Sequence, residues 1–421
     1  MKKSNETIWL ISGLRTPFVK VDGALKNYDV LDLSVPLVKA NIALHNLIPD
    51  LLIWGSVAPN LGYSNLAREI IMDAGLDRTI PAFTTIMACS TSMMAAIEAA
   101  SLINEDQIAL VGGTESMSRI QLGLNQDFSD WLRRLFQAKS FKEKIGKLKD
   151  LKFGNIRLFI PSVSNRSTGL SMGEHSEITT KRLDIKRKPQ DEIALKSHQN
   201  YIKGRNDGFF ENLISPLNGI TGDTIPRENT SIEKLSSLNP VFDKESGNGT
   251  LTAGNSSLLT DGAAGLWVCK EKGKEKFPKG SYAVKLIDWE IAAVNIEEDG
   301  LLMATTYAIP RLLARHKLRY EDIDLWEIHE AFGAQVVANV QLLEDKDHLD
   351  KAGVSFDFGS FPWDNLNPHG GSIAIGHPFA ATGARIISQA IKELAQKGAG
   401  KKAVVSICAD GGLGTVMLLK S

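Results

Sequence analysis

Two hydrophobic periodicities alternate along the chain. Short β-branched runs with nearly continuous apolar residues predict buried strands at TIWLIS (7–12), QIALVGG (107–113), YAVKLIDWEI (282–291) and KKAVVSICADGG (401–412). Ala-rich segments whose apolar positions recur every three or four residues predict helices at STSMMAAIEAASLI (90–103) and GARIISQAIKELAQKG (383–398). This alternation of strands and helices indicates an α/β fold.

The strand and helix pattern occurs twice. In the first half, the helix that follows Cys89 precedes the strand ending in VGGTES by about 20 residues. In the second half, the helix after GHP precedes the strand ending in CADGG by about 30 residues. We therefore predict two similar α/β halves packed as a layered α/β sandwich. The first would span 1–121 and be completed by about 250–275, and the second would span 276–421.

Residues 122–249 break this pattern with long polar stretches, and we predict that they form an inserted loop lobe. The segment 131–160 at its start holds nine Lys or Arg against two acidic residues. Its apolar residues recur at steps of four, three and three, which predicts an amphipathic helix that Pro161 ends. The stripe consists of Phe141, Ile145, Leu148 and Leu151.

Composition limits the function classes. A net charge of -1 and a pI of about 6.7 argue against a general nucleic-acid binder, which needs a basic face. The three cysteines, Cys89, Cys269 and Cys408, form no CxxC pair and suggest neither a disulfide framework nor a zinc site. The N-terminus has no signal-peptide pattern, and no apolar run is long enough to span a membrane. We expect a cytoplasmic protein.

Cys89 is the first candidate for chemistry. It lies in TTIMACSTSMMAAIEAA (84–100), where a strand-like run gives way to a helix of small residues. Its sulfur is therefore expected near a helix N-terminus, where the dipole and free N–H groups lower a thiol pKa. A lone cysteine more often has a buried apolar role. The choice depends on what accompanies it.

Three further candidates lie at element ends in the second half. His377 precedes a proline, which suits the first turn of a helix. Cys408 ends an apolar strand and opens a glycine loop whose N–H groups could hold an oxyanion. His329 follows another strand, but Gly333 stands where a zinc-protease motif needs a second His, which excludes that motif.

Eight motifs in order resemble the thiolase family, and together they cover the chain from end to end. They are RTPF (15–18), NLAR (65–68), ACSTS (88–92), GGTESMS (112–118), TAGNSSLLTDGA (252–263), HEAF (329–332), GGSIAIGHPFAATGAR (370–385) and CADGGLG (408–414). The resemblance implies a thiolase fold and acyl transfer with coenzyme A as co-substrate. It implies no metal and no permanently bound cofactor. The family also implies a homodimer.

The resemblance assigns a role to each candidate. Cys89 would take the acyl group after giving its proton to His377, and Cys408 would protonate the departing enolate. His377 and His329 would hold the enolate oxygen. The backbone N–H groups of Cys89 and Asp410 would hold the oxygen of the tetrahedral intermediate. Met172, Phe242, Ser257 and Phe332 fall where thiolases line the pantetheine tunnel, although each also fits a core role.

Asp410 departs from the family, in which most members have Gly or Ala at this position. A carboxylate here would disfavour nearby negative charge and raise the pKa of Cys408. Alternatively, its side chain turns away to pair with a neighbour. An inhibitory carboxylate would leave a low-activity acyl-CoA-binding scaffold subunit as an alternative function.

His329 replaces the Asn that most thiolases carry, and HEAF (329–332) instead resembles the thiolase β-subunit of the fatty-acid oxidation trifunctional enzyme. That subunit also carries a basic helical insertion. The resemblance implies a 3-ketoacyl-CoA thiolase with an α-subunit partner that has hydratase and hydroxyacyl dehydrogenase activities. Segment 131–160 would contact that partner or a membrane surface, or would be a solvated cover over the lobe. A biosynthetic acetoacetyl-CoA thiolase is the nearest rival, and a decarboxylating ketoacyl synthase would not need Cys408.

Overall fold

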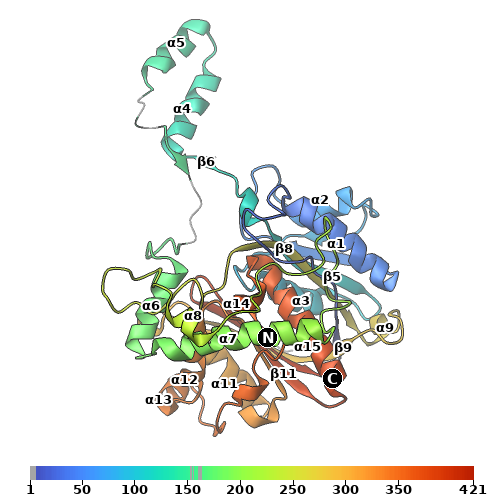
Figure 1. Cartoon of the computed structure of the whole chain (residues 1–421). Helices are drawn as coiled ribbons and strands as arrows, with labels where there is room; N and C mark the ends of the chain where they lie inside the picture. Colours follow the sequence, from blue (N-terminus) through green and yellow to red (C-terminus); the bar gives the residue numbers. More distant parts are fainter. Residues whose placement is uncertain (1–5, 152–153, 155, 160–163) are drawn as a thin grey trace.

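One mixed β-sheet runs through the molecule in the order β10-β11-β12-β9-β1-β8-β5-β3-β4 (Figure 1). The structure is a computed structural model that describes residues 6–151, 154, 156–159 and 164–421. The strands of this sheet are β1 (Ile8–Ile11), β3 (Leu51–Gly55), β4 (Ala82–Phe83), β5 (Ile108–Glu115), β8 (Thr260–Lys270), β9 (Ala283–Ala293), β10 (Leu325–Ile328), β11 (Lys402–Ala409) and β12 (Leu413–Lys420), and the short β2 (Val19–Lys20) pairs with β8. These strands include the four that the hydrophobic runs predict.

Strand pairing confirms two similar halves. In the first half, β3 pairs with β5 in parallel, β5 with β8 antiparallel and β8 with β1 antiparallel. In the second half, β10 likewise pairs with β11 in parallel, β11 with β12 antiparallel and β12 with β9 antiparallel. The halves meet where β1 and β9 pair antiparallel, from Ile8 opposite Leu286 to Ile11 opposite Ala283. The α/β class and the repeated unit predicted from sequence are therefore present.

Helices cover both faces of the sheet. The two helices that the sequence predicts, α3 (Thr91–Leu102) and α15 (Thr382–Lys397), pack against each other on one face. On the other face, α1 (Val30–His45) and α2 (Leu66–Asp73) cover the first half, and α11 (Thr305–Arg315) and α12 (Gly333–Leu343) cover the second. Because side chains alternate between the faces of a strand, β8 supplies Leu266 to the α3/α15 core and Trp267 to the α1/α2 core. Because both faces are covered, every position of β5 and β8 is buried.

The chain after residue 164 crosses to the second half. There α6 (Met172–Arg182) and α7 (Arg187–Asn206) pack against α12, and α7 also contacts α8 (Ile232–Ser236) and α14 (Ser372–Ile375). Residues from the middle of the sequence therefore pack against helices α12 and α14 of the second half. The short elements are α9 (Glu271–Lys274), α10 (Ile296–Asp299), α13 (Lys346–Lys351) and the 3-10 turns η1 (Met117–Arg119), η3 (Tyr320–Asp322), η4 (Trp363–Asn365) and η5 (Phe379–Ala381).

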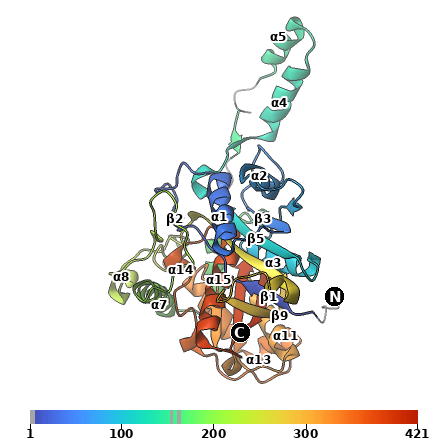
Figure 2. The ribbon, with the colours of Figure 1, turned by 90° about the vertical axis from the view of Figure 1, so that its right-hand side faces the viewer.

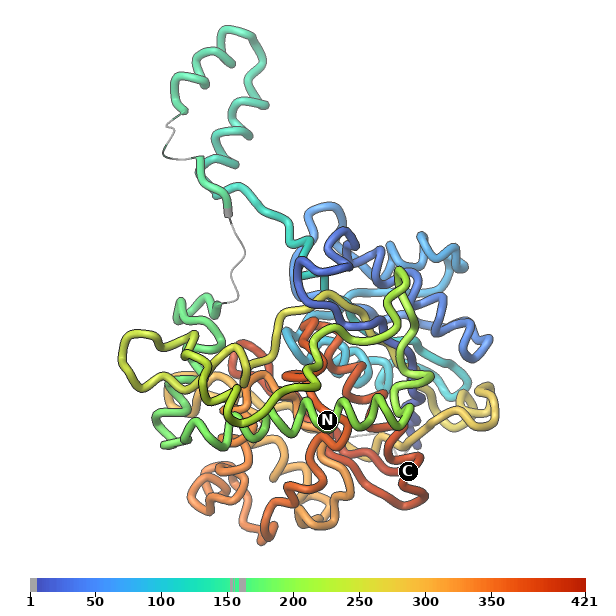
Figure 3. Tube along the Cα trace, in the orientation of Figure 1, coloured from blue at the N-terminus to red at the C-terminus, as the bar shows by residue number. Residues whose placement is uncertain are grey.

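A helical hairpin stands clear of the body (Figures 1, 2 and 3). It consists of α4 (Gln126–Gln137) and α5 (Phe141–Lys149), above the paired strands β6 (Gly123–Leu124) and β7 (Leu158–Phe159). Trp131 holds the two helices together, because its Nε1–H donates to the carbonyl of Lys147 at 2.9 Å. We call residues 123–151 the basic hairpin.

The prediction of one amphipathic helix over 131–160 is wrong in its boundaries. The first helix begins earlier, and Ser140 starts a second one through a capping box with Glu143. Leu151 lies beyond the end of α5, and Pro161 lies outside the described residues. The apolar side chains of Phe141, Ile145 and Leu148 are exposed. Among the described residues, no helix has the length and apolar character needed to cross a membrane.

Candidate active site

A tight turn presents Cys89 between β4 and α3. Ala88 adopts a left-handed conformation with φ 45°, which is unusual for a residue with a side chain. Thr91 stabilises the turn, since its Oγ1 accepts from the Met87 N–H at 2.8 Å and donates to the Ala88 carbonyl at 2.7 Å. Such strain persists only where its surroundings enforce it, and it is common at functional sites. The half-buried Cys89 is thus held in one position.

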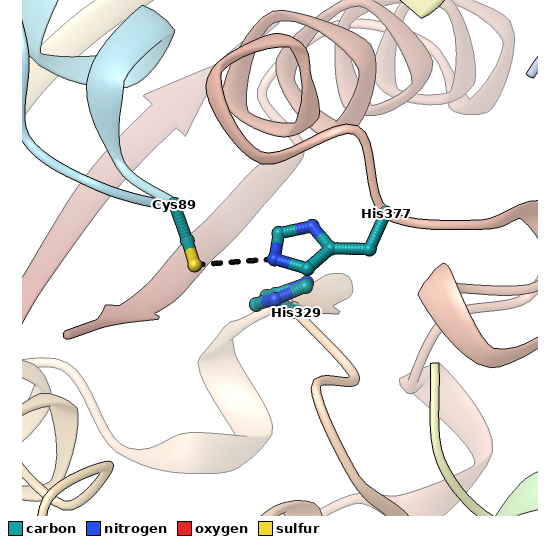
Figure 4. Close-up of side chains that lie close together, drawn as sticks. All are labelled: Cys89, His329 and His377. Atoms are coloured by element: carbon teal, nitrogen blue, oxygen red, sulfur yellow. Dashed lines mark hydrogen bonds between the residues drawn. The ribbon is translucent and has the colours of Figure 1, made fainter. Parts of the chain in front are cut away.

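His377 meets Cys89 across the two halves, with its Nε2 3.1 Å from the Cys89 sulfur (Figure 4). The sequence placed His377 in the first turn of a helix, and this is wrong. The residue is extended and bridges Leu259, and its N–H donates to the Leu258 carbonyl at 3.0 Å. Helix α15 begins only at Thr382, after the 3-10 turn η5. An extended backbone lets the imidazole reach the other half of the molecule.

Thr382 fixes the tautomer of His377. Its Oγ1 lies 2.7 Å from His377 Nδ1, so Nδ1–H donates to Thr382 when Nε2 accepts from the Cys89 thiol. Burial, with a smaller contribution from the charge of Arg385, lowers the pKa of His377 to about 3. The imidazole is therefore a neutral base at physiological pH.

His329 lies beside His377, with ring centroids 4.3 Å apart (Figure 4). Its Nδ1 is 2.8 Å from Ser372 Oγ, which also accepts from Arg385 Nη2 at 2.8 Å. Burial, then the neighbouring His377 and Arg385, lowers the pKa of His329 well below its usual value. When Ser372 donates to Nδ1, Nε2–H of this neutral ring is a buried donor with no partner among the described residues.

Cys408 lies near the end of β11 and is 2 % exposed. Its strand contacts the turn that presents Cys89, because the Ser90 hydroxyl donates to the Ile407 carbonyl at 3.3 Å. Burial, followed by the nearby Cys89, raises the pKa of the Cys408 thiol. Cys408 is therefore a protonated thiol close to Cys89, which suits a proton donor.

The prediction of a lowered pKa for Cys89 is wrong. Burial and then the carboxylate of Asp410 raise the pKa of Cys89 to about 12. Backbone N–H groups of Cys89 and Asp410 act in the opposite direction, but they are outweighed. The resting pair is therefore a thiol and a neutral imidazole, and the thiolate forms only when His377 takes the proton.

Asp410 turns toward a neighbour, as one of the two sequence interpretations holds. Its Oδ1 accepts from Asn165 Nδ2 at 2.8 Å and from the Gly411 N–H at 2.7 Å. The sequence placed its charge effect on Cys408, whereas the carboxylate acts on Cys89. Its backbone N–H also points to Cys89.

Replacing Asp410 by Asn should make Cys89 more reactive. The amide keeps an oxygen for Asn165 and Gly411 while it removes the charge that raises the Cys89 pKa. We expect alkylation of Cys89 by iodoacetamide at pH 8 to become at least about threefold faster, measured by mass spectrometry. The exposed Asp73→Asn serves as the control. Equal alkylation rates in Asp410→Asn and the parent protein would mean that the Asp410 carboxylate does not lower the reactivity of Cys89.

The lowered pKa of His377 predicts the acid side of the pH–rate profile. A base with a pKa of about 3 stays unprotonated as the pH falls from 7 to 5, whereas an ordinary imidazole would gain a proton near 6.5. We expect kcat/KM for acyl transfer to change less than about twofold over this range, with folding checked by circular dichroism. A tenfold loss per pH unit below 6.5 would contradict the assignment.

A cavity of about 190 Å³ opens on Cys89. Its wall includes Val57 and Ala58, whose N–H groups donate to the buried carboxylate of Glu115 at 3.0 and 2.9 Å. The remaining lining is mostly apolar and comprises Pro59, Ala88, Met117, Ile120, Ser164, Met172, Phe379 and Asp410. Such a slot suits a flexible, largely apolar ligand.

The four residues expected to bind substrate lie in one region. Met172 lines the cavity and packs with Phe242, Phe332 and Cys408 in one apolar cluster. The rings of Phe242 and Phe332 meet edge to face at 5.7 Å. Ser257 donates its N–H to the Ala331 carbonyl at 3.0 Å, next to Phe332. Their role in binding stays a prediction.

Sequence reasoning missed the hydroxyl partners of both histidines. Ser372 and Thr382 stand five residues before and five residues after His377, within GGSIAIGHPFAATGAR. Both face an imidazole Nδ1, and Arg385 from the same motif contacts Ser372. A hydroxyl residue on each side of the candidate base His377 was the sequence pattern that could have revealed them. Only the fold shows that Ser372 contacts His329 instead of His377.

Two family models and a curated relative match this chain over nearly its whole length. The family model for the thiolase N-terminal domain matches residues 8–272, and the model for the thiolase C-terminal domain matches residues 282–421. A 3-ketoacyl-CoA thiolase from Shewanella frigidimarina is 34% identical over an alignment of 427 positions, which covers 99% of this chain and 97% of that protein.

Two solved structures show the same fold. The Bacillus anthracis acetyl-CoA acetyltransferase is similar with a TM-score of 0.79 and 28% identity, over 99% of this chain and 98% of that chain. The human mitochondrial 3-ketoacyl-CoA thiolase in complex with CoA is similar with a TM-score of 0.78 and 25% identity, again over 99% and 98%.

Proposed function

We propose a reaction for this chain, which belongs to the thiolase family. It is a 3-ketoacyl-CoA thiolase, an acetyl-CoA C-acyltransferase that cleaves 3-ketoacyl-CoA with CoA to acetyl-CoA and a shortened acyl-CoA in fatty-acid β-oxidation. The observation that carries the proposal is the Cys89–His377 contact of 3.1 Å across the two halves, with Cys408 and His329 beside it. Coenzyme A is the co-substrate, and no cofactor is permanently bound.

The first half-reaction forms the acyl-enzyme. His377 Nε2 takes the Cys89 proton, and the thiolate attacks the ketone carbon of the substrate. Backbone N–H groups of Cys89 and Asp410 stabilise the resulting oxyanion. The bond between the second and third carbons then breaks, and its electron pair moves into the thioester enolate. Cys408 donates a proton to the second carbon, so acetyl-CoA leaves.

The two histidines stabilise the enolate. The unpartnered Nε2–H of His329 and the protonated Nε2 of His377 are donors for the thioester oxygen. In the second half-reaction, the Cys408 thiolate takes the proton of CoA, whose sulfur attacks the acyl group on Cys89. Expulsion of the Cys89 thiolate, which recovers the proton from His377, releases the shortened acyl-CoA and restores both cysteines.

The nearest alternative is a biosynthetic acetoacetyl-CoA thiolase. The similarity to the acetyl-CoA acetyltransferase supports this alternative. The 34% identity with a 3-ketoacyl-CoA thiolase and the basic hairpin favour the degradative enzyme. Both reactions use the same four side chains, so substrate length separates them.

CoA-dependent loss of 3-ketoacyl-CoA tests the proposed function. A four-carbon and a sixteen-carbon substrate would be compared at equal concentration, with product acyl-CoA measured by chromatography. The proposal expects a higher kcat/KM for the longer substrate. Preference for the four-carbon substrate would favour the biosynthetic enzyme. Absence of cleavage of either substrate, even with Asp410→Gly, would favour an acyl-CoA-binding scaffold.

We further propose that the enzyme forms a homodimer. This homodimer would assemble with an α-subunit that carries hydratase and hydroxyacyl dehydrogenase activities. The basic hairpin would contact that subunit or a membrane surface. The side chains of Phe136 and Phe141 are each 80% exposed, on helices that also carry several lysines and arginines. Exposed apolar side chains beside basic ones are typical of helices that lie on anionic surfaces. These features of the basic hairpin support the proposal that the protein binds peripherally to a membrane.

Removing the apolar side chains of α5 should weaken this contact. We expect the triple variant Phe141→Ser, Ile145→Ser, Leu148→Ser to bind anionic liposomes at least about tenfold more weakly in sedimentation, because each side chain buries apolar area on binding. The exposed Leu61→Ser, outside the hairpin, is the control. Unchanged liposome binding together with unchanged assembly with an α-subunit would contradict the proposal.

A further inference from the structure

Three potential metal ligands converge at the base of the cavity. The Cys89 sulfur and one nitrogen from each of His329 and His377 all lie within 4.8 Å of one another. A tetrahedral zinc ion has ligands about 2.0 to 2.3 Å from the metal, which places the ligand atoms about 3.3 to 3.7 Å apart. Small side-chain rotations would bring the three atoms to these separations, and the Cys89–His377 distance of 3.1 Å is already close to them.

Both imidazoles have the outer partners that metal-bound histidines need. His377 Nδ1 faces Thr382 Oγ1 at 2.7 Å, and His329 Nδ1 faces Ser372 Oγ at 2.8 Å. Thr382 Oγ1 accepts the Nδ1–H of His377, and metal binding selects the His329 tautomer in which Ser372 Oγ accepts Nδ1–H instead of donating to Nδ1. Each Nε2 then has a lone pair for a cation. His329 Nε2 is buried and has no partner among the described residues, so this nitrogen gives up no hydrogen bond when it coordinates.

We propose that Cys89, His329 and His377 bind a single borderline-soft divalent cation such as Zn²⁺, and that the bound ion blocks acyl transfer. One thiolate and two imidazoles form a ligand set that prefers Zn²⁺ to Mg²⁺ or Ca²⁺. Coordination replaces the Cys89 S–H bond by a sulfur–metal bond and releases the proton to solvent. The ion then occupies the nucleophile and the base together, and one coordination position stays open for water.

The sequence contains no metal motif because the ligands come from three distant segments. Cys89 precedes α3, His329 follows β10, and His377 precedes η5. Only the packing of the two halves brings them together. His329 is the residue that completes the set, so a thiolase with Asn at this position would offer only two of the three ligands.

Cobalt binding tests the site independently of catalysis. We would titrate the purified, reduced full-length protein with Co²⁺ without oxygen and follow the sulfur-to-cobalt charge-transfer absorption. The proposal expects one Co²⁺ per chain, displacement by Zn²⁺, and no displacement by excess Mg²⁺. Cys89→Ser should lose the charge-transfer band, and His329→Asn should bind at least about tenfold more weakly. Cys269→Ala, which removes a cysteine buried in β8, should bind as the parent protein does.

A second measurement uses the parent protein alone. Zn²⁺ should protect Cys89 from iodoacetamide, as shown by peptide mass spectrometry, and a chelator should restore both alkylation and turnover. A charge-transfer band that persists in Cys89→Ser would overturn the proposal, as would full alkylation of Cys89 at saturating Zn²⁺. Either result would leave the proposed thiolase activity untouched, because that activity is measured without metal.

Discussion

Replacing Cys89 by Ala is expected to lower kcat/KM for cleavage of 3-ketoacyl-CoA by at least about 10⁴-fold, because the substitution removes the thiol that forms the covalent intermediate. Its thiol is the one in contact with His377, and the cavity opens on it. The measurement is CoA-dependent loss of the 3-ketoacyl-CoA absorbance. Alanine removes only one sulfur atom, so the site should keep its shape.

The control for this loss is Cys269→Ala. Cys269 is fully buried in the α1/α2 core, and its removal should leave kcat/KM within a few-fold of the parent value. Equal melting temperatures of Cys89→Ala and the parent protein would establish that the loss is chemical. If Cys89→Ala kept more than a tenth of the activity, the acyl-enzyme route would be wrong.

Replacing Cys408 by Ala should separate the two parts of the reaction. Loss of this proton donor is expected to lower cleavage of 3-ketoacyl-CoA by about 10² to 10⁴-fold, because the enolate must be protonated as it leaves. Transfer of an acetyl group between acetyl-CoA and labelled CoA forms no enolate. It still needs Cys89 and His377, so this exchange should stay measurable in Cys408→Ala and vanish in Cys89→Ala.

Isotope exchange between acetyl-CoA and labelled CoA measures this difference. An exchange rate within about a hundredfold of the parent value, combined with the larger loss of cleavage, is the expected pattern. Cys408 also serves as base for the incoming CoA, which is why some loss of exchange is expected. Equal losses in both assays would mean that Cys408 supports the structure of the site instead of protonating the enolate.

The sequence could predict the elements that bury continuous apolar faces. The runs that became β1, β5 and β11 are apolar on both faces because helices cover both sides of the sheet, whereas β9 alternates between buried and more exposed positions. A continuous apolar run carries that information directly for a strand, and a period of 3.6 residues carries it for a helix. The basic hairpin was harder to predict, because its apolar residues are exposed and because the division into two helices depends on the local cap at Ser140.

The candidate catalytic residues each stand in a short motif, and the structure brings Cys89, His329 and His377 together as a group. Their electrostatics could not be predicted from those motifs. The helix N-terminus next to Cys89 suggested a lowered pKa, but burial and Asp410 dominate. Burial is a property of the packed halves, and no local pattern reports it. The same holds for Ser372, which is five residues from His377 in sequence but contacts His329.

One measurement tests the account most directly: mass spectrometry of the parent protein after brief incubation with a 3-ketoacyl-CoA in the absence of CoA. The account predicts a shortened acyl group on the peptide that contains Cys89, an equal yield of acetyl-CoA, and loss of the adduct when CoA is added. An adduct on Cys408 instead of Cys89, or acetyl-CoA formed without any adduct, would contradict it.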